Sequence, residues 1–222
     1  MKGKLIAIEG LDGSGKATQS QALCQAIQEM GLPVRRITFP DYESDSSALV
    51  RMYLAGKFGS SAQDVSAYAA SAFFAVDRFA SYRTDWGSFY QQGGILIADR
   101  YTTSNAIHQC SKLPRQEWPA FLDWLFDHEY NRLGIPAPDR VIYLRVDPEV
   151  SQQLMSQRYH NNETKKDIHE RDVDYLKQSR QAADYCAHTL GWITVECCEN
   201  QAMRSIESIQ GDVLAAVKEI LC

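Results

Sequence analysis

Residues 5–18 read Leu-Ile-Ala-Ile-Glu-Gly-Leu-Asp-Gly-Ser-Gly-Lys-Ala-Thr, and this stretch decides the fold of the chain. An apolar run from Leu5 to Ile8 leads into a glycine-rich loop, after which Lys16 opens a helical segment. This order of strand, loop and helix, with this spacing of glycines and lysine, is typical of a P-loop. The backbone N–H groups of such a loop and the positive end of the helix dipole both favour an anion. The stretch therefore predicts a cradle for the phosphates of a nucleoside triphosphate.

One position departs from the P-loop pattern. Ala17 stands where the pattern has a serine or threonine whose hydroxyl ligates Mg²⁺, and Thr18 follows one place later. Direct ligation of magnesium by residue 17 is thereby excluded, but the phosphate cradle does not depend on that hydroxyl. The residues assigned to the nucleotide site are Gly10, Leu11, Asp12, Gly13, Ser14, Gly15, Lys16, Ala17 and Thr18.

Composition narrows the class of protein. The chain has 222 residues, is 45% hydrophobic and carries a net charge of −5, which describes a soluble globular protein without a broad basic face for nucleic acid. Its longest apolar runs are far shorter than the roughly 18 residues of a membrane span. The six cysteines show no C-x-x-C spacing, so structural thiols are expected rather than a metal site. We expect one domain over residues 1–222, located in the cytoplasm, with neither membrane nor nucleic acid as a partner.

Short β-rich runs alternate with helical segments along the chain. Five strands are expected, at 4–9, 33–39, 95–98, 140–146 and 192–196. Helices are expected at 15–30, 46–56, 64–82, 84–92, 104–111, 115–133, 148–158, 170–190 and 203–221. In the first helix Leu23, Ile27 and Met30 form one apolar stripe, and Gly31 suits the left-handed C-terminal position. The pattern predicts an α/β fold with a five-stranded parallel sheet covered by helices on both faces.

A second polar motif follows the third predicted strand. The run from Ile95 to Ala98 ends in Asp99-Arg100-Tyr101, at the strand end where parallel sheets place their ligands. Arg100 is expected to neutralise charge between a phosphoryl donor and its acceptor. Two roles stay open for Asp99: a magnesium ligand, directly or through water, or a group that orients the acceptor. No Asn-Lys-x-Asp element for guanine occurs, so a small-molecule kinase, an ATPase motor and a regulatory nucleotide-binding module remain.

Taken together, these motifs resemble the thymidylate kinase family. The resemblance rests on the P-loop, on the pair Phe39-Pro40, on Phe74 four residues before Arg78, and on residues 99–105, Asp-Arg-Tyr-Thr-Thr-Ser-Asn. It implies a P-loop kinase fold that transfers the terminal phosphate of ATP to dTMP with Mg²⁺, usually as a homodimer. The nucleotide bound at the P-loop is then ATP.

The resemblance also implies roles for single residues. Asp12 would contact the sugar 3′-hydroxyl, Phe74 would stack on thymine, and Arg78 would hydrogen-bond to the base. Arg100 would hold the acceptor phosphate and Asn105 would read the base edge. The spacing agrees, because residues 74 and 78 share one face of a helix. The full set assigned to the acceptor site is Asp12, Phe39, Pro40, Phe74, Arg78, Arg100, Ser104, Asn105 and His108.

At several positions this chain departs from the pattern of the family it resembles. Asp41 follows Phe39-Pro40 where relatives often have an arginine, and His108 stands where some have a tyrosine that crowds the 2′ position of the sugar. Gly13 provides no side-chain cation in the P-loop, so the charge is expected from a polar lid at about 158–174. Arg158 is the first choice there, before Lys165, Lys166 and Arg171. The catalytic set is Lys16, Asp99, Arg100 and Arg158.

Two other functions remain open. A deoxynucleoside kinase would share the fold and an Asp-Arg element, although the order of Phe74, Arg78 and Asp-Arg-Tyr argues against it. A catalytically weak nucleotide-binding regulator would suit the missing hydroxyl at Ala17. Phosphorylation of dTMP, of thymidine or of neither separates the three.

Overall fold

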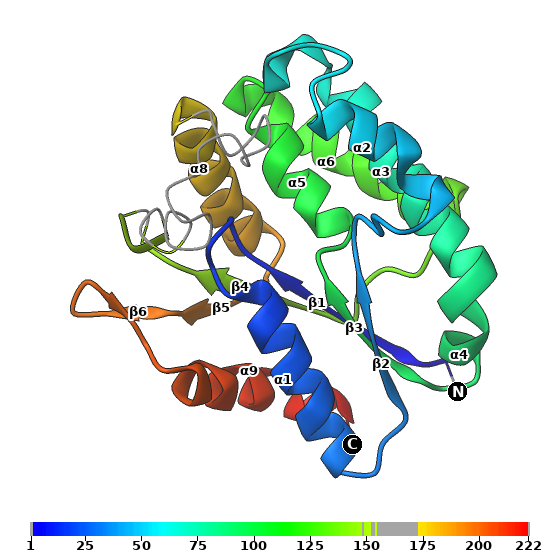
Figure 1. Ribbon diagram of the computed structural model, residues 1–222, viewed down its shortest axis with the longest axis vertical. Coiled ribbons are helices and arrows are strands. Elements are labelled where there is room, and N and C mark those ends of the chain that lie inside the picture. The colour runs from blue at the N-terminus through cyan, green and yellow to red at the C-terminus, as the bar shows by residue number, and fades with distance from the viewer. Residues whose placement is uncertain (1, 148, 152–153, 155–172, 222) are drawn as a thin grey trace.

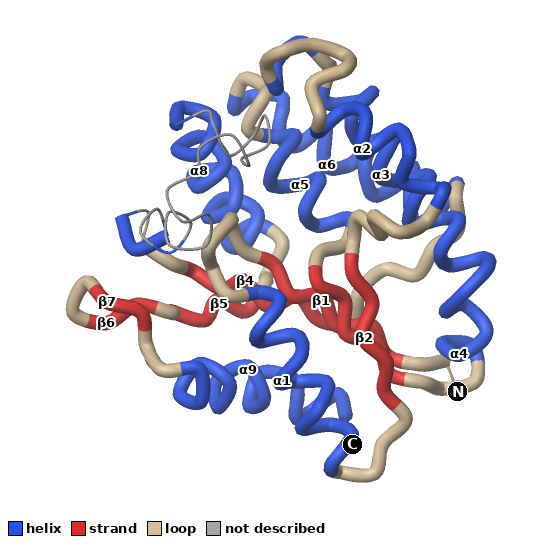
Figure 2. The backbone as a smooth tube through the Cα atoms, in the orientation of Figure 1, coloured by secondary structure: helices blue, strands red, loops and turns tan. Residues whose placement is uncertain are grey.

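A computed structural model describes residues 2–147, 149–151, 154 and 173–221. A five-stranded sheet divides the molecule, and all its neighbouring strands run parallel, in the order β2-β3-β1-β4-β5 (Figure 2). The strands are β1 Lys4–Glu9, β2 Val34–Thr38, β3 Ile95–Asp99, β4 Arg140–Arg145 and β5 Ile193–Glu196. The predicted α/β fold with a parallel sheet is confirmed, and each strand lies within two residues of its expected bounds.

Helices cover both faces of this sheet. On one face lie α1 Lys16–Glu29 and α9 Ile206–Leu221, and on the other lie α3 Ala67–Ser81, α5 Thr102–Cys110, α6 Trp118–Phe126 and α8 Val173–Thr189 (Figure 1). Two shorter helices are α2 Ala48–Leu54 and α4 Gly87–Gln91. Leu23 and Ile27 of α1 are fully buried against the strands and α9. Among the described residues, none of the helices combines the length and apolarity needed to cross a membrane.

Several expected helices are shorter or interrupted. The helix expected at 46–56 is reduced to α2 after a 3₁₀ turn over Asp45–Ser47, and that expected at 203–221 begins at Ile206 because Met203 belongs to a short strand. The helix expected at 64–82 begins at Ala67, because Ser66 caps it by accepting a hydrogen bond from the Ala69 amide, and residues 62–64 form a separate 3₁₀ turn. The helix expected at 84–92 divides into the π-helical turn η3 Tyr82–Trp86 and α4. That expected at 115–133 divides into the 3₁₀ turn Arg115–Glu117, α6 and the π-helical turn η5 Asp127–Arg132.

Two further predictions need correction. Met30 does not continue the apolar stripe of α1, because the helix ends at Glu29 and the Met30 side chain is 53% exposed, although Gly31 does adopt the expected left-handed conformation (φ 77°). A hairpin of β6 Cys198–Glu199 and β7 Ala202–Met203 was not expected, because its turn, with positive φ at both central residues, contains no glycine.

Several predictions lie outside the described residues. They concern residues 158–172 of the expected lid, which include Arg158, Lys165, Lys166 and Arg171, and most of the helix expected at 148–158.

Candidate active site

A cavity of about 1060 Å³ lies at the carboxyl edge of the sheet, where β1, β2 and β3 end. The P-loop lines one side, and the ends of β2 and β3 with α3 and α5 line the other. Sixteen predicted site residues line it: Asp12, Gly13, Ser14, Gly15, Lys16, Ala17, Thr18, Phe39, Pro40, Phe74, Arg78, Asp99, Arg100, Ser104, Asn105 and His108. Gly10 and Leu11 are not among the lining residues, although they belong to the same loop, and Arg158 lies outside the described residues.

The P-loop conformation depends on its glycines. A Cβ atom at Gly10 would lie 2.4 Å from Ser14 Oγ and 2.9 Å from the Leu144 carbonyl oxygen, so no larger residue fits without movement. Gly15 has φ 82° and forms the N-cap of α1, a left-handed conformation that favours glycine. The first turn of α1 is thereby directed into the cavity, as anion binding at a helix N-terminus requires.

Lys16 is held inside the loop that it follows. Its Nζ donates hydrogen bonds to the Leu11 carbonyl oxygen (2.7 Å) and to Ser14 Oγ (3.4 Å). Burial, and then the nearby positive charge of Arg100, lower the pKa of Lys16 to about 8. A bound phosphate would oppose both effects, because its negative charge stabilises the protonated amine.

This pKa predicts a pH dependence of nucleotide binding. Below about pH 8 Lys16 is already protonated, whereas above it the free protein loses that proton and bound phosphate restores it. ADP binding at about pH 9 should therefore take up protons, and ADP affinity should fall as the pH rises further. Calorimetry in two buffers of different ionisation enthalpy measures the uptake. Equal uptake in the Lys16→Ala variant would show that another group is responsible.

Arg100 connects the P-loop to α5. It adopts the left-handed conformation (φ 68°), and its Nη2 pairs with the Asp12 carboxylate. Its Nη1 lies 3.4 Å from Ser104 Oγ and 3.1 Å from His108 Nε2. Asp12, Arg100, Ser104 and His108, which the sequence assigns to one acceptor site, are thus brought together. Arg100, predicted to bind the acceptor phosphate, is paired with Asp12, predicted to bind the sugar hydroxyl.

Asp99 has a partner that sequence reasoning missed. Arg36 of β2 donates from Nη2 to Asp99 Oδ2 (2.8 Å) and from Nε to Ser20 Oγ of α1 (2.8 Å). A weak signal was present, because Arg36 is a charged residue within the short edge strand that pairs with the strand carrying Asp99. The pair orients the Asp99 carboxylate at the edge of the cavity.

Two buried carboxylates were also missed. Glu9, at the end of β1, accepts hydrogen bonds from the Tyr101 amide (3.0 Å), Thr103 Oγ1 (2.6 Å) and Ser104 Oγ (2.7 Å). Burial raises the pKa of Glu9, and the charge of Arg100 with these hydrogen bonds opposes the rise. Glu9 therefore fixes the start of α5, directly after Arg100.

The second buried carboxylate, Glu129 of η5, contacts the predicted base-binding residues. It accepts two hydrogen bonds from Arg78, at 2.7 Å from Nε and 2.6 Å from Nη2. Phe74, one helical turn before Arg78, packs edge-on against Tyr53 with ring centroids 6.3 Å apart. The structure thus confirms that residues 74 and 78 share a face of α3 and line the cavity, but it also shows that Arg78 is already paired.

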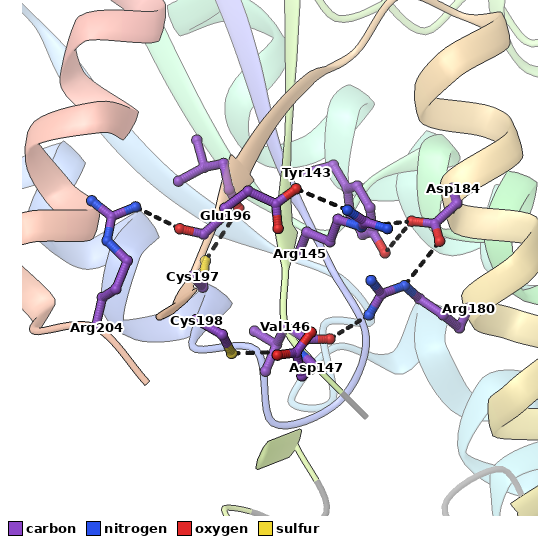
Figure 3. Close-up of polar contacts among 11 residues, drawn as sticks. Tyr143, Arg145, Val146, Asp147, Arg180, Asp184, Glu196, Cys197, Cys198 and Arg204 are labelled. Carbon is purple, nitrogen blue, oxygen red and sulfur yellow. Dashed lines mark hydrogen bonds and ion pairs between the residues drawn. The ribbon is translucent and has the colours of Figure 1, made fainter. Parts of the chain in front are cut away.

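The unexpected hairpin adds to the P-loop side of the cavity. Met203 and Arg204 are among the lining residues, and Met203 Cε lies 3.7 Å from the position of a Cβ atom on Gly15. Behind it, Arg145 bridges Asp184 of α8 and Glu196 of β5, and Arg204 donates to the Glu196 carbonyl oxygen (Figure 3). The two ion pairs of Arg145 connect β4 with α8 and β5, and the hydrogen bond of Arg204 connects β5 with the residue that follows the hairpin.

Known proteins resemble this chain along most of its length. A family model described as "Thymidylate kinase" matches residues 8–212. The chain is 33% identical over 183 residues to the thymidylate kinase of Mycobacterium tuberculosis (strain H37Rv), covering 82% of this chain and 83% of that protein. The chain belongs to the thymidylate kinase family. It is also 28% identical over 223 residues to a probable thymidylate kinase of Pyrococcus horikoshii, covering 100% of this chain and 98% of that protein.

The fold of a solved thymidylate kinase, that of Candida albicans, matches with a TM-score of 0.71 at 21% identity, over 99% of this chain and 92% of that one. Members of the thymidylate kinase family phosphorylate dTMP to dTDP with ATP, and the chain has this activity as a member. Membership favours this activity over the two alternatives, a deoxynucleoside kinase and a catalytically weak nucleotide-binding regulator.

Proposed function

We propose that ATP lies along the P-loop and dTMP between α3 and α5, with the two reacting phosphates meeting beside Arg100. One observation carries this arrangement: the P-loop residues and the predicted dTMP residues line a single cavity. The cavity volume of about 1060 Å³ lies at the upper end of the range for ligand pockets, so the cavity offers a large ligand-binding space. An oxygen of the acceptor phosphate then attacks the γ-phosphorus of ATP, the bond to the bridging oxygen breaks, and ADP leaves.

The side chains contribute mainly charge and position, as is usual in phosphoryl transfer. Lys16 moves from the Leu11 carbonyl to the outer phosphates of ATP. Arg100 neutralises the acceptor phosphate, exchanging part of its pairing with Asp12 for a phosphate oxygen. Asp12, released from that pair, becomes available to the sugar hydroxyl.

Magnesium belongs to the same proposal, and the residues present fit it. Mg²⁺ in kinases is held by one or two carboxylates together with substrate phosphates, and it neutralises charge on the phosphates. Asp99 lines the cavity and is the residue we assign to hold the ion, directly or through water, with Thr18 nearby in the same lining. Arg36 already forms an ion pair with Oδ2 of that carboxylate, so the magnesium ion would compete with Arg36 for Asp99.

The single-domain organisation with a lid at about 158–174 stays a prediction. Because Gly13 places no cation beside the transferred phosphoryl group, we assign that charge to Arg158. The kcat of the Arg158→Ala variant tests this assignment. A reduced kcat with unchanged dTMP affinity would support it, whereas an undiminished kcat would refute it.

A homodimer and a cytoplasmic location are likewise proposed. The outer face of α3 exposes Tyr68, Val76 and Phe79. Tyr68 packs on the half-buried Trp124 of α6, so the apolar surface of α3 extends to that residue. Light scattering on the purified protein tests the dimer, which should weigh about twice the 25.1 kDa of the chain. A particle of single-chain mass at micromolar concentration would contradict it.

The activity itself has a direct test. With ATP and Mg²⁺, the protein should release ADP and form dTDP in the presence of dTMP, and should show only background ADP release with thymidine or without an acceptor. ADP release that does not depend on dTMP, or that thymidine supports better, would contradict the proposal.

His108 should affect sugar selectivity. It lines the acceptor side of the cavity, next to Arg100, and the position is one where some relatives crowd a 2′-hydroxyl. We expect His108→Ala to raise the UMP to dUMP ratio of kcat/KM by roughly tenfold, the scale of one steric contact in a pocket. If the kcat falls equally with all acceptors and the ratio is unchanged, His108 serves only to hold Arg100.

A further inference from the structure

Glu129 is a fully buried carboxylate behind the acceptor end of the cavity. It belongs to η5 and is not among the residues that line the cavity. Besides the two hydrogen bonds from Arg78, it accepts one from Thr102 Oγ1 at 2.8 Å. Buried carboxylates are costly unless they are paired, so Glu129 and Arg78 depend on each other. Burial by itself would lower the pKa of Arg78, but the charge and hydrogen bonds of Glu129 hold it above its usual value.

The same carboxylate also reaches Asn105 of α5. The Asn105 amide nitrogen Nδ2 donates to the Ser71 carbonyl oxygen (3.3 Å) and to Glu129 Oε1 (3.5 Å). Both partners can only accept, so the NH₂ group faces them and the amide oxygen Oδ1 is left for a ligand. A rotated amide would place Oδ1 against two acceptor oxygens.

Arg78 is constrained in a complementary way. Glu129 engages Nε and Nη2, so Nη1 is the guanidinium nitrogen that remains for a ligand in the cavity. Arginine can only donate hydrogen bonds. The base-reading surface therefore presents a donor from Arg78 beside an acceptor from Asn105.

This order of donor and acceptor matches one class of pyrimidine. Thymine and uracil have an acceptor at O4 and a donor at N3–H, whereas cytosine has a donor at its 4-amino group and an acceptor at N3. We infer that Glu129 is a positioning residue that fixes the donor and the acceptor presented to the base, and thereby discriminates dTMP from dCMP. The inference rests on the proposed placement of dTMP between α3 and α5.

Glu129→Gln tests it with the smallest change in shape. Glutamine replaces a charged acceptor by a group that also donates, so Arg78 loses its charge-assisted partner and a rotated Asn105 amide becomes more acceptable. We expect KM for dTMP to rise about tenfold or more, the scale of a hydrogen bond to a charged group, while KM for ATP changes little. The ratio of kcat/KM for dTMP to that for dCMP should fall by about tenfold.

Glu9→Gln is the matched control, because Glu9 is also a fully buried acid that holds α5 but has no contact with Arg78 or Asn105 among its hydrogen bonds. It should lower turnover with every acceptor and leave the dTMP to dCMP ratio at the wild-type value. Thr102→Val removes one hydrogen bond from Glu129 while keeping its charge, and should also leave the ratio unchanged.

Thermal melting and ADP binding show whether each variant folds. If Glu129→Gln does not fold, Glu129→Asp takes its place: it keeps a charge for Arg78 but withdraws the carboxylate from Asn105, so the ratio should still fall a few-fold. A folded variant with the wild-type ratio would overturn the inference. A wild-type protein that phosphorylates no dTMP would instead refute the proposed function, so the two failures are distinguishable.

Discussion

Replacing Lys16 by alanine should lower kcat for dTMP phosphorylation by about 10²–10³-fold, the effect of removing one donor that stabilises developing charge in comparable sites. Lys16 Nζ is the only amino group among the described residues that line the cavity. It is also held by the Leu11 carbonyl in the free protein, so it needs to move only a short way to reach a phosphate. Steady-state kinetics with saturating ATP and dTMP measure the change.

Lys112 provides a matched control. Its pKa is also lowered to about 8 by burial, but its Nζ binds the Tyr53 hydroxyl (2.7 Å) and the Val65 carbonyl (3.0 Å), and it does not line the cavity. Lys112→Ala should reduce thermal stability while kcat stays within a few-fold of wild type. If the two variants lose turnover equally, or if Lys16→Ala stays within about tenfold of wild type, the phosphate cradle has been assigned wrongly.

Replacing Arg100 by alanine should have a comparable or larger effect, about 10³-fold on kcat/KM for dTMP, because it removes both a ligand of the acceptor phosphate and a charge that stabilises the transferred group. KM for ATP should change less than KM for dTMP. The left-handed backbone conformation at residue 100 is as unfavourable for alanine as for arginine. The backbone conformation therefore does not explain a loss of activity in Arg100→Ala.

The control for this variant is Arg145→Ala. Arg145 also stands at the carboxyl end of a central strand, and its guanidinium also pairs with carboxylates, those of Asp184 and Glu196 (Figure 3). It does not line the cavity. Arg145→Ala should lower the thermal stability of the protein while kcat/KM for dTMP stays close to the wild-type value. Retention of dTMP turnover in Arg100→Ala within about tenfold of wild type would show that another group binds the acceptor phosphate.

The sequence predicted the sheet well for a simple physical reason. A strand in a doubly covered parallel sheet is a short continuous apolar run, and the runs at Leu5, Ile95 and Val141 are all fully or nearly fully buried. The P-loop was equally predictable, since its glycines and lysine are constrained within one local segment. Met30 was wrongly placed on the apolar stripe of α1, and the β6–β7 hairpin was not expected, because helix ends and turns without glycine carry little local signal.

The partners of the site residues could not be predicted in the same way. The predicted site residues that Arg36, Glu9 and Glu129 contact lie at least 24 positions away in the chain, and the local sequence pattern does not show which residues will pair. A glutamate in a charged stretch usually faces solvent, yet Glu129 is fully buried because the π-helical turn directs it towards Arg78. The identities of the predicted site residues were therefore easier to infer than the network that holds them.

The most direct test of the central claim, that one cavity holds ATP and dTMP together, is inhibition by an analogue in which adenosine and thymidine are joined through a chain of phosphates. The analogue spans both halves of the cavity if the P-loop and the α3–α5 surface face each other as described. Its inhibition should be competitive with ATP and also competitive with dTMP, and Lys16→Ala and Arg78→Ala should each weaken its binding. Competition with only one of the two substrates would contradict a shared cavity.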